Sequence, residues 1–123
     1  MSTLSRATGT TRERRARDFY PTIDPRAVAK LVPHLPPNAV IAEPCAGDGE
    51  LMHQLAMAGY PCLWGADIEP QRRHIAKQDA LLLDESLLFG ATIFVTNPPW
   101  FRKWLHRLIR HLASLRPTWL LFD

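Results

Sequence analysis

The sequence AVIAEPCAGDG, residues 39–49, joins a short apolar run to an acidic, glycine-rich turn. An unbroken apolar run over residues 39–42 is typical of a strand that is buried on both faces of a parallel sheet. Apolar residues at helical spacing follow the turn, and Gly59 is suited to end a helix there. The inward face of that helix is expected to consist of Leu51, Met52, Leu55 and Ala58. This stretch therefore predicts a strand, a turn and a helix in succession.

The same alternation continues along the rest of the chain. Further strands are expected at residues 62–66, 75–80, 92–95 and 119–122, and further helices at residues 25–32, 69–75 and 101–115. Asp24 as a helix cap and Pro25 at the first helical position begin the earliest of these helices. Residues 81–88 are expected to form one or two helical turns. Strands that alternate with helices predict an α/β fold, namely a Rossmann-like, doubly wound, mainly parallel sheet truncated after its fifth strand.

Polar and glycine-rich residues gather where the expected strands end. They occupy residues 43–49, Asp67, Asp79 and residues 97–100. In doubly wound sheets, ligands bind beyond the carboxyl ends of the strands. The strand ends are therefore the expected functional site.

Charge divides the chain into two parts. Residues 1–17 contain five arginines and one acid, whereas the whole chain carries a net charge of +3. We expect a basic arm over residues 1–17 and one domain over residues 18–123, and the arm suits either nucleic acid phosphates or a solvated tail. No apolar run is long enough to span a membrane and no signal peptide is evident, which predicts a cytoplasmic protein. With two cysteines, neither a disulfide framework nor a metal site is expected.

The first turn favours a cationic ligand. It carries Glu43, Asp48 and Glu50, whereas a site for phosphate needs amide donors and cations. An acidic turn suits S-adenosylmethionine, which carries an ammonium and a sulfonium and no phosphate. Asp67 would then accept the ribose hydroxyls, and Asp79 an exocyclic adenine amine. The alternative interpretation is that each acid caps a helix or solvates a loop.

Residues 97–100, Asn-Pro-Pro-Trp, present hydrogen-bond acceptors and a flat ring. Pro98 and Pro99 have no amide donors, so the acceptors are the Asn97 side-chain oxygen and the Pro98 carbonyl. Two acceptors that converge on an NH2 group orient it for nucleophilic attack, while Trp100 offers a face for stacking. The alternative is a strand ended by proline, with an aromatic residue that packs on the core.

These residues resemble motifs of the amino-group methyltransferases. Residues 97–100 resemble the N/D-P-P-Y/F/W motif of S-adenosylmethionine-dependent enzymes, especially those that methylate adenine N6 in DNA. Residues 43–49 resemble the cofactor motif of this family, and residues 19–22 resemble the segment that closes over the methionine part of the cofactor. The catalytic motif implied is Asn97, Pro98, Pro99 and Trp100. The cofactor contacts implied are Phe19, Tyr20, Thr22, Glu43, Pro44, Cys45, Gly47, Asp48, Gly49, Asp67, Ile68, Asp79, Ala80 and Asn97.

Several alternatives remain open for the substrate and the partners. Similar motifs serve methyltransferases that act on an RNA base or a glutamine amide, and a non-catalytic module that binds cofactor or nucleic acid is a further possibility. An expected basic face of the last helix favours nucleic acid as the partner. That face consists of Arg102, Lys103, His106, Arg107, Arg110 and His111. Family sheets continue past a fifth strand, and no separate target-recognition domain is evident. The chain would therefore be a fragment, or it would rely on a dimer, on a partner subunit or on loose specificity.

Overall fold

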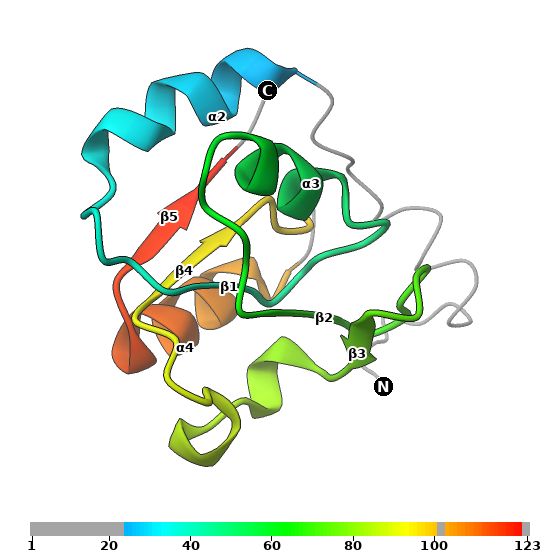
Figure 1. Cartoon of the computed structure of the whole chain (residues 1–123). Coiled ribbons are helices and arrows are strands. Elements are labelled where there is room, and N and C mark those ends of the chain that lie inside the picture. The colour runs from blue at the N-terminus through cyan, green and yellow to red at the C-terminus, as the bar shows by residue number, and fades with distance from the viewer. Residues whose placement is uncertain (1–23, 101–102, 122–123) are drawn as a thin grey trace.

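A single five-stranded parallel sheet organises the protein (Figure 1). The computed structural model describes residues 24–100 and 103–121. The strands are β1 (Ile41–Glu43), β2 (Trp64–Asp67), β3 (Ile75–Lys77), β4 (Ile93–Thr96) and β5 (Thr118–Leu120). Their spatial order is β3-β2-β1-β4-β5, and every pairing is parallel. The predicted Rossmann-like α/β fold is confirmed.

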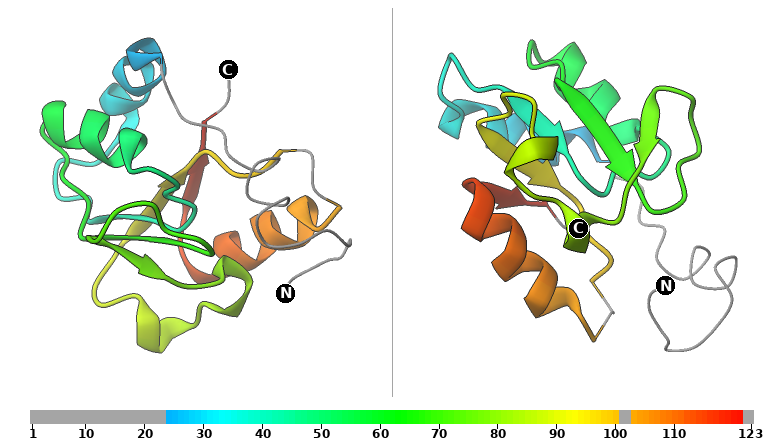
Figure 2. Two further views of the ribbon diagram at one scale, coloured as in Figure 1. Left: turned by 90° about the vertical axis from the view of Figure 1, so that its right-hand side faces the viewer. Right: turned by 90° about the horizontal axis from the view of Figure 1, so that it is seen from below.

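Helical segments cover both faces of the sheet. The α-helices are α2 (Pro25–Leu31), α3 (Glu50–Met57) and α4 (Leu105–Leu115). The 3-10 turns are η1 (Val32–His34), η2 (Ala80–Leu82) and η3 (Glu85–Leu87). Helices α2 and α3 lie together on one side of the sheet, and α4 lies on the other (Figure 2). Within residues 24–100 and 103–121, no helix has the length and apolar character needed to cross a membrane.

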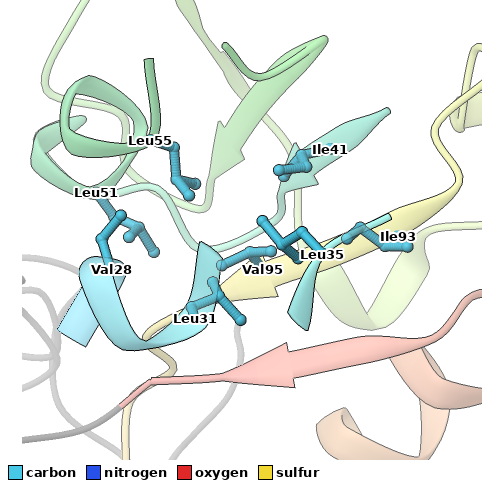
Figure 3. Close-up of a cluster of buried hydrophobic side chains, with 8 residues drawn as sticks. All are labelled: Val28, Leu31, Leu35, Ile41, Leu51, Leu55, Ile93 and Val95. Atoms are coloured by element: carbon cyan, nitrogen blue, oxygen red, sulfur yellow. The ribbon is translucent and has the colours of Figure 1, made fainter. Parts of the chain in front are cut away.

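Alternate side chains of the central strands build two hydrophobic clusters. Ile93 and Val95 of β4 belong to the cluster under α2 and α3 (Figure 3). Phe94, between them in sequence, belongs to the cluster under α4. Successive strand residues point to opposite faces, so an unbroken apolar run supplies both clusters at once. This arrangement is the physical reason that β4 is apolar at three successive positions.

The topology brings the ends of β1 and β4 together. In the register of the sheet, Ala42 of β1 lies opposite Trp64 on one side and opposite Phe94 on the other. The chain leaves β1 towards β2 and β3, and it returns only later to form β4 on the opposite side. Ligands of doubly wound sheets bind at such a reversal of strand order. The turn after β1 and the loop after β4 therefore begin side by side.

Two local predictions were wrong. Residues 69–75 form bends and turns that lead into β3, and the predicted helix is absent from this segment. Ile75 is the one buried residue of that segment, so a helix there would have no apolar face to bury. Ala58 is exposed rather than inward, because α3 ends at Met57 and the chain turns at Gly59 with a positive φ of 94°.

Gly65 marks a close approach between β2 and the segment that follows β1. A Cβ atom at this position would overlap the Met52 sulfur and would lie 3.3 Å from the Ala46 Cβ. We therefore expect Gly65→Ala to lower the free energy of unfolding by ~1–3 kcal/mol through overpacking. Chemical denaturation measures this change. Adding Met52→Ala should recover part of the loss, and a purely additive double variant would contradict the proposed clash.

Candidate functional site

Glu43 lies at the centre of the strand ends. Its side chain is 1% exposed at the end of β1. Its Oε2 atom accepts hydrogen bonds from the Thr96 hydroxyl at 2.6 Å and from the Cys45 backbone N–H at 2.9 Å. Thr96 is the last residue of β4, so one carboxyl oxygen joins the ends of two neighbouring strands.

Burial raises the pKa of the Glu43 carboxyl to about 8. The hydrogen bonds from Thr96 and from the Cys45 backbone act against this rise in pKa, and the negative charge of Asp67 adds to it. A cation that arrives beside Glu43 would favour its ionised form by direct attraction. Without such a cation the carboxyl stays mostly protonated below about pH 8, so it becomes an anionic partner only when a positive charge favours its ionisation.

The raised pKa predicts how stability depends on pH. Between the ordinary pKa of 4.5 and about 8, the folded chain keeps a proton on Glu43 that the unfolded chain loses. The free energy of unfolding should consequently fall as pH rises through this window, by up to ~1.4 kcal/mol per pH unit. Urea unfolding at a series of pH values measures this slope.

Glu43→Gln is the control for this prediction, because it keeps an acceptor oxygen and removes the titration. As pH rises through this window, the free energy of unfolding of the variant should fall less than that of the wild type. Parallel curves for the wild type and the variant would show that Glu43 does not titrate there.

The glycine turn, residues 47–49, is hydrogen-bonded to the end of β2. Gly47 and Gly49 adopt positive φ angles of 57° and 85°, and Gly49 directly precedes α3. The Gly47 N–H donates to Asp67 Oδ1 at 3.1 Å, and the Glu69 N–H donates to Asp67 Oδ2 at 2.9 Å. Asp48 Oδ1 accepts the N–H of Glu50, the first residue of α3, at 3.0 Å, while Gly49 is the N-cap residue of that helix. Asp67 therefore shapes the turn in addition to any contact it makes with a ligand.

The next acid along the sheet edge, Asp79, serves as a cap. It lies two residues beyond β3, and its Oδ1 accepts the Leu81 N–H at 2.9 Å at the start of η2. Ala80 beside it is buried, whereas Ile68, the residue after β2, is half-buried. These contacts support the interpretation of Asp79 as a helix cap, and they keep its carboxylate at the same edge as Asp67.

Asn97 and Trp100 contact each other in the loop after β4. The Trp100 indole N–H donates to Asn97 Oδ1 at 2.9 Å. Both side chains are half-buried, and Pro98 and Pro99 between them are buried. An amide oxygen can accept two hydrogen bonds, so the indole uses one of these directions. The side chain expected to orient an amine and the ring expected to stack are therefore joined by a hydrogen bond.

Sequence reasoning missed Thr96 as part of the site. The only signal for it is a hydroxyl at the end of an otherwise apolar strand, directly before Asn97. Structure brings Glu43 and Thr96 into contact, and likewise Gly47 and Asp67. The expected contacts Phe19, Tyr20 and Thr22 lie outside the described residues, as does the arm over residues 1–17.

The two cysteines are free thiols held in their neutral form. Burial raises the pKa of Cys45 well above its ordinary value, and it raises the pKa of Cys62 to about 12. Since the thiolate is the nucleophile and the metal ligand, neither thiol is suited to these roles near neutral pH. Pro44, next to Cys45, is fully buried. In the part of the chain with described coordinates, no cluster of three or more His, Cys, Asp or Glu side chains could hold a metal.

The basic face of α4 is smaller than predicted. Lys103, His106, Arg107 and Arg110 are exposed on and just before this helix. His111 is half-buried, and its Nε2 lies 2.7 Å from the Leu83 carbonyl oxygen, so it belongs to the packing beneath the helix. Arg102 lies outside the residues that the structure describes.

Comparisons with protein-family models, with curated proteins and with solved structures find no match to this chain.

Proposed function

We propose that this protein transfers a methyl group from S-adenosylmethionine to the N6 amine of adenine in DNA. One observation carries the proposal: the buried Glu43 carboxyl is hydrogen-bonded to Thr96, the residue directly before Asn97. A carboxyl suited to a cation and a loop of hydrogen-bond acceptors therefore start from adjacent strand ends. Methyl transfer to an amine needs both, because the methyl donor is cationic and the acceptor carries N–H groups.

The acidic side chains at the strand ends fit S-adenosylmethionine better than a phosphate-bearing cofactor. Glu43 and Asp67 end β1 and β2, Asp79 lies two residues beyond β3, and all three side chains offer acceptor oxygens. When bound, S-adenosylmethionine supplies a methyl group that its sulfonium makes electrophilic. Glu43 would attract the cationic part, and the residues around the Gly47 turn would line the remainder.

Asn97 and Pro98 would orient the target amine. The Asn97 Oδ1 atom and the Pro98 carbonyl would each accept an N–H, which aims the nitrogen lone pair at the methyl carbon. Binding an amine at Oδ1 requires the Trp100 indole to share or release that oxygen. The indole ring would then be able to stack on a base that has left the duplex. The new nitrogen–carbon bond would form as the carbon–sulfur bond breaks and leaves a neutral thioether, and the methylated amine would then lose its proton.

Nucleic acid is the partner that the surface charge favours. The exposed cations on and before α4, Lys103, Arg107 and Arg110, are joined by His106 on the same helix. Such a surface attracts phosphates, and its binding to DNA should weaken as salt concentration rises. The arginines of residues 1–17 would add to this attraction.

Transfer of labelled methyl groups tests the proposal directly. The full chain is incubated with S-adenosylmethionine carrying a labelled methyl group, together with DNA, RNA or protein. We expect label in DNA, recovered as N6-methyladenine after digestion. Label in RNA or in a glutamine amide would show that DNA is not the substrate. Cofactor binding without transfer would indicate a binding module. The absence of both binding and transfer would refute the proposal.

Asp67 provides a separate test of cofactor binding. Asp67→Asn should weaken the binding of S-adenosylmethionine by ~1–3 kcal/mol, because it removes a charged acceptor at the end of β2. Calorimetry measures the dissociation constant. Asp84→Asn is the matched control, since Asp84 also accepts a backbone N–H two residues on, from Ser86 at 2.9 Å, in an exposed loop. Equal affinities for all three proteins would remove Asp67 from the site.

A further inference from the structure

Thr96 carries a buried hydroxyl in a position where an apolar residue would satisfy the sheet. Its side chain is 0% exposed, and the three residues before it in β4 are apolar. The hydroxyl donates to Glu43 Oε2 at 2.6 Å, across a separation of 53 residues in sequence. Burying a hydroxyl is costly unless it is hydrogen-bonded, so this bond accounts for its presence.

The bond lies between two segments that must act together. The oxygen that accepts from Thr96 also accepts from the Cys45 N–H at 2.9 Å, and Cys45 lies at the start of the glycine turn. On the other side, Thr96 is covalently followed by Asn97, whose Oδ1 contacts the Trp100 indole. One carboxyl oxygen therefore connects the turn after β1 to the loop after β4.

We propose that Thr96 is a positioning residue for the proposed methyl transfer. Thr96 holds the Asn97 loop in register with Glu43, and it favours the ionised form of that carboxyl. This inference rests on the proposed function. Thr96 touches neither the amine nor the methyl group, and it acts through Glu43 and Asn97. A hydroxyl that donates to a carboxylate stabilises the charge, and it does so most strongly in a buried site.

The surroundings of Glu43 give this donor a measurable role. Burial and the charge of Asp67 both disfavour the ionised carboxyl, while the hydroxyl of Thr96 and the backbone N–H of Cys45 favour it. The thiols of Cys45 and Cys62 lie within its electrostatic reach and are held neutral. Removing the hydroxyl should therefore raise the pKa of Glu43 above its present value of about 8.

Thr96→Val and Thr96→Ser form a matched pair for the test. Valine keeps the shape and removes the donor, whereas serine keeps the donor and removes a methyl group. Affinity for S-adenosylmethionine and the rate of methyl transfer are measured from pH 6 to pH 9 on the full chain. We expect Thr96→Val to lower turnover by about tenfold or more and to move the rise in affinity to higher pH. Thr96→Ser should restore both values.

The outcomes separate this inference from the proposed function. An active wild type whose turnover and pH profile are unchanged in Thr96→Val would overturn the role of Thr96 alone. A wild type that transfers no methyl group at any pH would overturn both. If Thr96→Val does not fold, Thr96→Ala removes the same donor with less bulk, and the comparison with Thr96→Ser is made on that variant. Loss of activity in Thr96→Val and Thr96→Ser alike would show that packing, and not the hydroxyl, is what matters.

Discussion

Asn97→Ala is expected to reduce methyl transfer by ~100-fold or more, comparable to the loss of one donor from an oxyanion hole. Alanine removes Oδ1, the atom that now accepts the Trp100 indole N–H at 2.9 Å and that would accept an amine N–H during the reaction. The loss should appear in turnover, because the acceptor matters most once the amine is aligned for attack. Single-turnover rates with labelled cofactor measure it. Calorimetry measures separately how much cofactor affinity is lost with Asn97, which is also an implied cofactor contact.

Two further variants make this result specific. Asn97→Asp keeps an acceptor oxygen and should retain more activity than Asn97→Ala. Trp100→Phe removes the indole donor and keeps a ring for stacking, so its main effect should be on substrate affinity. A folded Asn97→Ala with undiminished transfer would show that the loop is structural and that the proposed chemistry is wrong.

Phe94→Ala is expected to lower the free energy of unfolding by ~3–5 kcal/mol. Phe94 is 0% exposed at the middle of β4 and is among the largest fully buried side chains. Its ring meets the Trp64 ring edge-on, with 6.4 Å between the ring centroids. Alanine would leave a cavity between the sheet and α4 that neighbouring side chains fill only in part. Urea denaturation followed by circular dichroism measures the change.

Phe89→Ala is the matched control, because it makes the same substitution at an exposed position. Phe89 is 73% exposed, so its loss should change stability by no more than ~0.5 kcal/mol. Its φ of 52° is equally strained for phenylalanine and alanine, so backbone strain does not enter the comparison. Similar losses for the two variants would mean that Phe94 does not anchor the core.

The fold was predictable because local patterns agree with the final arrangement. Residues 92–95 read as a buried strand, and β4 occupies Ile93–Thr96. Asp24 caps α2 as expected, through its bond from the Arg26 N–H at 2.9 Å. The segment 69–75 was not predictable in the same way. Its course depends on contacts distant in sequence, such as the bond from the Gln71 N–H to the Gly47 carbonyl at 3.4 Å.

For the site, the sequence indicated which strand ends to examine but not how their side chains pair. Glu43 and Asp67 were singled out by their place after apolar runs. That Asp67 would hold the Gly47 N–H, or that Trp100 would donate to Asn97, depends on side-chain orientation, which no spacing rule determines. Thr96 was missed for the same reason, because its partner lies 53 residues away.

The strand order has a consequence for how the chain folds. Pairing β1 with β2 closes a short loop, and the Gly47–Asp67 bond spans only 20 residues. Joining β4 to β1 closes a far longer one, since Glu43 and Thr96 are 53 residues apart, at an additional entropic cost of about 0.9 kcal/mol. Early folding species are therefore expected to contain the glycine turn with β2 already docked and the Asn97 loop still detached. The two halves of the site meet only when this longer closure forms, so the chemistry of the site depends on the pairing of β4 with β1.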